Sequence, residues 1–308
     1  MGNVFKSIAR TENITKIAVR SRLLVLIAAF CFATTGTSRA LGPDSATSLG
    51  VAAVRFIVGA TALFAITALI RKPHVTTATL PLYIWIIAGF GQAMYGATFF
   101  AAVHETGVAV GTVVALGSAP ILTGILSAVL FRSRPSRSWM LATSVAIGGM
   151  ALIVLSGSDA TVSVAGTVYA LGAGFGYALF ALASKRIVAS GVPSDIAMSR
   201  VFALSALMLA PTLFFVNTDW IFTQDGISLT LWLGIVTVAL AYWAYASGLV
   251  HLEPRETTMI TLAEPVVATI LGAVVLNERP EVLSWLGIVI VISALAYEAR
   301  STSPNMKH

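Results

Sequence analysis

Residues 118–135 read SAPILTGILSAVLFRSRP, and residues 263–280 read AEPVVATILGAVVLNERP. The two stretches lie 145 residues apart, and this offset aligns the prolines at the third and last positions of each stretch without a gap. The same offset pairs Arg55 with Arg200. Prolines and arginines are costly within apolar helices, so their coincidence is informative. We interpret the match as an internal repeat.

The composition indicates a membrane protein. Of the 308 residues, 57% are hydrophobic and 10% are charged, whereas a soluble domain has about 25% charged residues. The mean hydropathy is +0.89. In hydrocarbon a backbone must satisfy its own hydrogen bonds, so apolar spans of this kind form helices. We therefore expect an all-α integral membrane protein.

Ten apolar segments are long enough to cross about 30 Å of hydrocarbon as helices. They are residues 22–40, 47–70, 80–102, 107–131, 138–156, 163–184, 196–216, 228–250, 256–276 and 281–299. Together with the 145-residue offset, these segments predict two five-helix repeats, at 22–156 and 157–299. Short tails at 1–21 and 300–308 flank the two repeats. Because five is odd, the second copy enters the membrane from the opposite side. The predicted fold is therefore ten transmembrane helices as two inverted repeats, an arrangement that suits alternating access.

The basic residues indicate membrane orientation rather than nucleic-acid binding. The net charge is +6, and the bases form short clusters between apolar segments. If the N-terminus is cytoplasmic, fifteen of the nineteen Lys and Arg residues lie inside and two outside. This bias predicts a multi-pass protein of the cell inner membrane with both termini in the cytoplasm. The single cysteine, Cys31, and the absence of a Cys/His cluster predict no internal disulfide, no metal site and no cofactor.

Short motifs recur at and after the fourth helix of each copy. The second copy has LAEP at 262–265, LNERP at 276–280 and Gly287; the first has SAP at 118–120, FRSRP at 131–135 and Gly148. With these motifs the chain resembles the EamA-type transporters of the drug/metabolite transporter superfamily over nearly its whole length. The first copy lacks the glutamates that the second copy has in these motifs, at Glu264 and Glu278. The resemblance implies a ten-helix inverted-repeat transporter, often an exporter of amino acids or other small metabolites. The aromatic third and eighth helices resemble the aromatic amino acid exporter subgroup.

Glu264 and Pro265 are expected near the middle of the membrane, where an unpaired carboxylate is costly. One interpretation makes Glu264 a proton-coupling group or a gate, together with Pro265 and its repeat counterpart Pro120. The other, which we favour, is that Glu264 satisfies backbone donors freed where Pro265 breaks the helix. The first copy has Ala119 at the matching position, so any coupling role is asymmetric.

Arg55 and Arg200 are the other charges expected within apolar segments. Either guanidinium is able to bind a substrate carboxylate. We favour the alternative, in which each side chain extends toward the interface and ties helices together.

Aromatic and polar residues within the spans predict a substrate cavity. Gln92, Tyr95 and Phe99 share one face of the third segment. The expected lining residues are Phe30, Thr34, Gln92, Tyr95, Phe99, Phe175, Tyr242 and Tyr245. Such a cavity suits an amphipathic small molecule or an organic cation. The alternative is that the rings only pack against lipid or neighbouring helices.

These features predict a secondary transporter that exports neutral or aromatic amino acids, with Gln92 and Thr34 binding the ammonium and carboxylate groups. The outward direction follows from the resemblance alone. The alternative is a multidrug or organic-cation exporter of the same fold. A membrane enzyme would need a cluster of nucleophile, base or metal ligands. A channel would need a ring of pore-lining residues or a filter sequence. The sequence shows neither pattern. The expected partners are a small-molecule substrate and the lipid bilayer, with no nucleic acid; the oligomeric state does not follow from the sequence.

Overall fold

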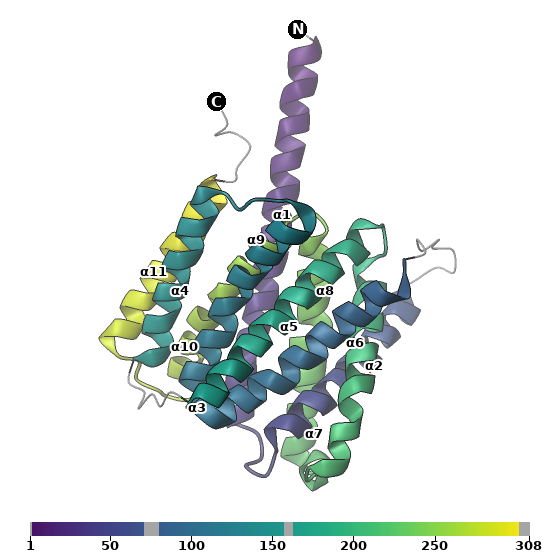
Figure 1. The fold of residues 1–308 in the computed structure, drawn as a ribbon, viewed down its shortest axis with the longest axis vertical. Helices are drawn as coiled ribbons and strands as arrows, with labels where there is room; N and C mark the ends of the chain where they lie inside the picture. The colour runs from purple at the N-terminus through teal and green to yellow at the C-terminus, as the bar shows by residue number, and fades with distance from the viewer. Residues whose placement is uncertain (1, 71–79, 157–162, 302–308) are drawn as a thin grey trace.

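The computed structural model describes residues 2–70, 80–156 and 163–301, and these residues form helices and connections without a strand. The elements are α1 (Gly2–Ala40), α2 (Ser48–Ile70), α3 (Leu82–Phe131), α4 (Arg137–Leu155), α5 (Val164–Ala189), α6 (Ser194–Leu209), η1 (Ala210–Phe215), η2 (Asp219–Phe222), α7 (Gln224–Trp232), η3 (Leu233–Leu240), α8 (Ala241–Leu249), α9 (Pro254–Ile260), η4 (Thr261–Ala263), α10 (Glu264–Val275) and α11 (Val282–Ser301). Figure 1 shows them as one bundle.

Ten stretches of the described residues are long and apolar enough to cross a membrane, as predicted. They are Lys16–Ala40, Ser48–Leu69, Leu82–Thr106, Val110–Phe131, Arg137–Leu155, Val164–Ala189, Ser194–Phe215, Gln224–Leu249, Pro254–Val275 and Val282–Ser301. Each overlaps its predicted segment, and the ends differ by a few residues. The loop at 71–79, the junction at 157–162 and residues 302–308 of the predicted C-terminal tail lie outside the described residues.

The third and fourth spans form a hairpin within the single element α3. A Cβ atom added to Gly111 would lie 3.1 Å from the backbone nitrogen of Val103, eight residues earlier. A straight helix separates such residues by about 12 Å, so the chain turns back between them. A glycine at this position leaves space for the two arms of the turn.

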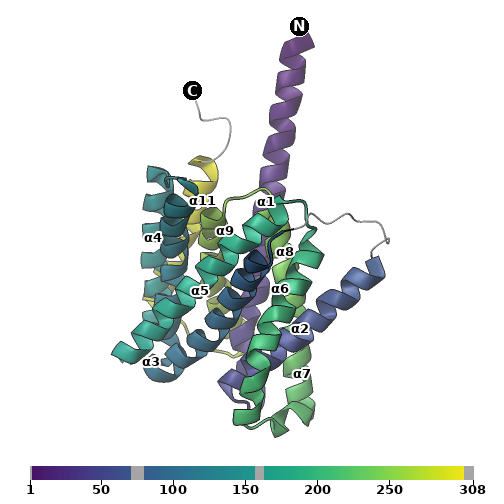
Figure 2. The same ribbon diagram turned by 45° about the vertical axis from the view of Figure 1, so that its right-hand side comes forward.

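The N-terminal helix is longer than predicted. Residues 2–21, expected as a polar tail, continue the helix of the first span, and α1 runs for 39 residues. Figures 1 and 2 show its beginning projecting beyond the bundle. The described chain begins and ends at the same end of the molecule.

Two hydrophobic clusters make up most of the core. The larger joins α1, α2, α3, α5, α6, η3, α8 and the end of α9, and includes Phe180, Phe202 and Tyr245. The smaller joins the second arm of α3 with α4, α9, η4, α10 and α11, and includes Trp139 and Met150. Both contain many alanines, which let helices pack closely in lipid.

Glycines allow the closest helix contacts. A Cβ atom added to Gly91 of α3 would lie 2.6 Å from the carbonyl oxygen of Gly176 in α5, and one added to Gly176 would lie 2.7 Å from that of Gly91. Gly149 of α4 and Gly287 of α11 form a similar pair. Side chains at these positions would force the helix backbones apart.

Candidate functional site

A cluster of aromatic rings fills the centre of the larger core. Tyr242 of α8 packs against Phe202 of α6 at 4.5 Å between ring centroids, and against Phe32 of α1 at 4.7 Å. Tyr177 of α5 contacts Tyr95 of α3 at 5.4 Å. The aromatic cluster comprises Phe32, Tyr95, Phe99, Tyr177, Phe180, Phe202, Tyr242 and Tyr245. It joins five elements from both halves of the chain.

Gln92 provides a buried amide within this cluster. Its side chain is fully buried, and its Nε2 donates a hydrogen bond of 2.8 Å to the hydroxyl of Tyr242. Its Oε1 is buried without a hydrogen-bond partner among the described residues. A buried amide normally uses both ends. The free acceptor therefore suits a donor on a bound molecule, such as an ammonium group.

Arg55 of α2 lies beside the cluster with 9% of its surface exposed. Its Cζ lies 5.0 Å from the ring centroid of Phe56 and 5.5 Å from that of Phe100, distances at which a cation is attracted to an aromatic face. Its Nε has no hydrogen-bond partner among the described residues. The guanidinium thus keeps a donor available within the core.

Glu264, the first residue of α10, lies within electrostatic range of Arg55, and both charges act on Tyr242. The opposite charges come from the second and ninth spans, far apart in sequence. A charge within the membrane costs less when an opposite charge is near. The structure brings these two side chains within electrostatic range of each other, without an ion pair between them among the described residues.

The ninth span is interrupted next to Glu264. It consists of α9, the 3-10 turn η4 and α10, and Pro265 occupies the first turn of α10. Proline fits there because its missing N–H belongs to a helix start. Pro120, by contrast, lies inside the uninterrupted second arm of α3. Both prolines are buried.

The eighth span contains a π-helical segment, η3, directly before Tyr242. Eight consecutive π-helical residues are unusual, and π-helical turns occur frequently at functional sites. The segment sets the direction from which Tyr242 and Tyr245 enter the aromatic cluster.

Comparison with known proteins places this geometry in a family. Residues 20–155 and residues 164–297 each match the model of the EamA-like transporter family. The chain belongs to this family. It is therefore a multi-pass membrane transporter with two copies of the EamA-like sequence unit.

Relatives within the EamA-like family include proteins with and without a known cargo. The chain is 38% identical over 273 residues to the uncharacterized transporter YwfM of Bacillus subtilis strain 168, covering 89% of this chain and 91% of that one. It is 26% identical over 245 residues to the threonine/homoserine exporter RhtA of Escherichia coli K12, covering 80% and 79%. A solved crystal structure matches with a TM-score of 0.79 at 18% identity, covering 94% and 99%, which shows a shared fold.

Five of the predicted lining residues come together in this EamA-like bundle: Gln92, Tyr95, Phe99, Tyr242 and Tyr245. Phe30, Phe175 and Thr34 do not join them. Phe30 is 52% exposed and Phe175 is 38% exposed. Thr34 accepts a hydrogen bond of 3.1 Å from the exposed indole of Trp232.

Residues two positions further along contribute to the aromatic cluster instead. Phe32 and Tyr177 are 8% and 5% exposed. Two residues along a helix rotate a side chain by about 200°, so Phe30 and Phe175 point away from the core. The repeat offset pairs Phe32 with Tyr177, but it pairs Phe30 with Phe175 equally well, so it does not choose between the two pairs. Phe180 and Phe202 carry no comparable signal.

Arg200 differs from its repeat counterpart Arg55. It is exposed, and its Cζ lies 5.3 Å from the ring centroid of the buried Trp85. Its position near the start of α6 fits the predicted extension toward the interface. No group of three or more His, Cys, Asp and Glu side chains in the described chain is arranged to hold a metal ion.

Proposed function

We propose that the chain is a secondary transporter that exports neutral or aromatic amino acids across the inner membrane by alternating access, with both termini in the cytoplasm. The observation that carries the substrate class is the placement of one basic and one acidic side chain, Arg55 and Glu264, within electrostatic range of each other beside the aromatic cluster. A zwitterion carries the same two charges with no net charge. In this proposal Arg55 binds the carboxylate, and Glu264 with the Oε1 of Gln92 binds the ammonium group.

The contacts of the bundle support an inverted repeat at 22–156 and 157–299. Gly59 of α2 packs against Gly234 and Val238 of η3, and Gly89 of α3 packs against Leu204 of α6. Adding 145 to 59 and to 89 gives 204 and 234, so each contact is the repeat image of the other. With five spans per copy, this relation inverts one copy with respect to the other, and exchange of conformations between the copies gives alternating access.

An aromatic side chain suits the surroundings of this charge pair. Rings with centroids 4.5 to 6.4 Å apart already contact one another in tilted or edge-to-face arrangements in the cluster. A ligand ring inserted among them would gain about 0.5–1.5 kcal/mol per ring pair beyond burial. The relative RhtA is named an exporter of threonine and homoserine, which supports the amino acid class and leaves the side chain open.

An organic-cation or multidrug exporter is the second candidate. The same aromatic faces attract cations, and Glu264 supplies a negative charge. This candidate gives Arg55 no ligand group to bind, so the amino acid is the better match.

Uptake into proteoliposomes tests the proposal, with labelled tryptophan, phenylalanine, leucine, threonine and lysine beside tetraphenylphosphonium. We expect saturable flux of the neutral amino acids, strongest for tryptophan and phenylalanine, and loss of that flux in Tyr95→Ala and Tyr242→Ala. Tyr297→Ala is the matched control, because Tyr297 is 48% exposed on α11. Flux of the cation alone would favour the second candidate, and equal flux in all variants would remove the site assignment.

A further inference from the structure

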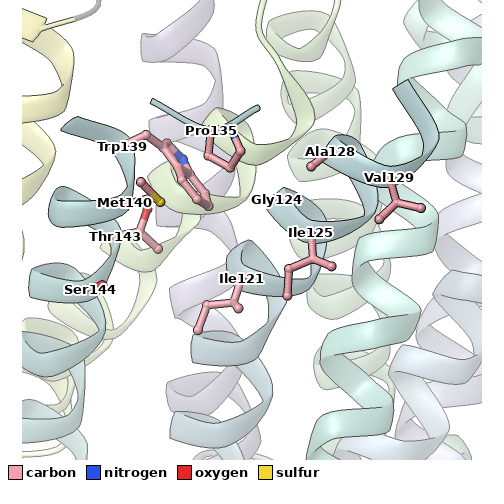
Figure 3. A pocket seen from close by; sticks show the side chains of 10 residues that line it. All are labelled: Ile121, Gly124, Ile125, Ala128, Val129, Pro135, Trp139, Met140, Thr143 and Ser144. Carbon is pink, nitrogen blue, oxygen red and sulfur yellow. The ribbon is translucent and has the colours of Figure 1, made fainter. Parts of the chain in front are cut away.

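A groove of about 450 Å³ lies away from the aromatic cluster, between the second arm of α3 and α4 (Figure 3). Its lining residues are Ile121, Gly124, Ile125, Ala128, Val129, Pro135, Trp139, Met140, Thr143 and Ser144. The indole ring of Trp139 packs against Gly124, where the missing side chain leaves room for it. The Nε1 of Trp139 donates a hydrogen bond of 3.2 Å to the carbonyl oxygen of Arg255, which fixes the ring.

The walls of the groove are apolar and face outward. Ile121, Ile125 and Val129 are 46%, 53% and 70% exposed. They follow one another along α3 over about 12 Å. Because the fourth and fifth spans lie in the membrane, the molecules that reach this surface are lipids and other membrane proteins.

Arginines lie at one end of the groove. The connection between α3 and α4 contains Arg132 and Arg134, and Arg137 begins α4. All three are exposed, and none forms an ion pair with another described residue. Pro135, between them, lines the groove itself. This end of the groove therefore places positive charge next to its apolar walls.

A polar atom lies deeper in the groove. Thr143 is 2% exposed, and its Oγ1 has no hydrogen-bond partner among the described residues. It follows Arg137 by six residues, or about 9 Å along the helix. Phosphate, then an ester, then an acyl chain is the order of groups in a phospholipid.

We propose that this groove binds an anionic phospholipid. Arg134 and Arg137 pair with the phosphate and headgroup charge, Thr143 donates to an ester carbonyl, and one acyl chain lies between α3 and α4 against Ile121 and Ile125.

The second repeat lacks these features. The positions that correspond to Arg132 and Arg137 hold Asn277 and Val282, and Glu278 and Glu281 lie close by. Ile288 corresponds to Thr143. The proposed lipid site thus belongs to the first repeat alone, and Arg279, the counterpart of Arg134, provides a matched control.

The experiment titrates the purified full-length protein in mild detergent with phosphatidylglycerol and with phosphatidylcholine of identical acyl chains. Melting temperature and native mass spectrometry report the binding. We expect phosphatidylglycerol to bind more tightly and to stabilise more. Arg134→Gln with Arg137→Gln should weaken its binding about tenfold or more, whereas Arg279→Gln should leave it unchanged. Ser144→Phe, at an exposed position in the groove, should weaken binding of both lipids.

Several results would overturn the proposal. They are equal binding of the two lipids, an unchanged preference in the double variant, or an equal loss in Arg279→Gln. Stabilisation by inorganic phosphate alone would assign the arginines to a soluble anion. A fall in molecular mass by light scattering in Ser144→Phe would show that a second copy of the chain covers the groove. Elution of each variant as a single species, with wild-type helicity, separates these results from misfolding.

Discussion

The Nε2 of Gln92 donates a hydrogen bond of 2.8 Å to the hydroxyl of Tyr242, and this bond joins the third span to the eighth. Both side chains are buried, with 0% and 4% exposure. The bond fixes the Gln92 amide, so that its Oε1 remains the free acceptor of the proposed site.

Tyr242→Phe removes this hydrogen bond while keeping the ring. We expect a loss of about 1–3 kcal/mol in stability, because the amide of Gln92 is left buried without its acceptor. Thermal melting in detergent measures the loss, and Tyr297→Phe, at an exposed position, should melt like the wild type. A wild-type melting temperature in Tyr242→Phe would show that the bond does not hold the two spans.

Glu264 and Arg55 should behave as a coupled pair. Glu264→Gln should lower the melting temperature and weaken substrate exchange and pH-gradient-driven transport together, because Arg55 loses its counter-charge. Arg55→Gln should reduce stability less in the Glu264→Gln background than in the wild type. The difference between the two losses, the coupling energy, should be about 0.5–3 kcal/mol. Arg200→Gln, an exposed arginine, is the control for coupling. Exchange that persists in Glu264→Gln while gradient-driven transport is lost would instead make Glu264 a proton carrier.

Gly176→Ala should separate α3 from α5. The new methyl group would lie 2.7 Å from the carbonyl oxygen of Gly91 and 2.8 Å from the nitrogen of Tyr95, and backbone atoms cannot rotate away. We expect a loss of about 1–3 kcal/mol and a raised KM, because Tyr95 and Tyr177 move with their helices. Gly148→Ala and Gly36→Ala meet no atom within 4 Å. Equal melting of all three variants would contradict the close contact.

Single-cysteine labelling tests the orientation. In a Cys31→Ser background, cysteines at Ser136 and Ser301 should react only from the cytoplasmic side, and one at Arg279 only from outside. The expectation rests on the fifteen-to-two distribution of basic residues and on the chain beginning and ending at the same end of the bundle. Labelling of Ser301 and Ser136 from opposite sides would contradict the predicted topology.

The sequence predicts the ten spans because lipid demands long apolar helices, and such segments are visible without tertiary information. It does not predict which face of a span points inward. Phe30 and Phe32 differ only in rotation about the helix, and the choice between them depends on neighbours that the sequence does not display. The nearness of Arg55 to Glu264 likewise depends on how α2 and α10 pack. The sequence does point to Gln92 and Tyr242 as residues well inside their spans, and the structure brings these two side chains into contact.

The two hydrophobic clusters give the molecule two lobes of unequal size. In the smaller lobe α4 and α11 pack mainly against each other, with little of the larger core behind them. Amide protection follows the extent of buried packing. Backbone amides of α4 and α11 should therefore exchange with deuterium as one group, before those of α5 and α8, and unfolding should begin at this edge of the bundle.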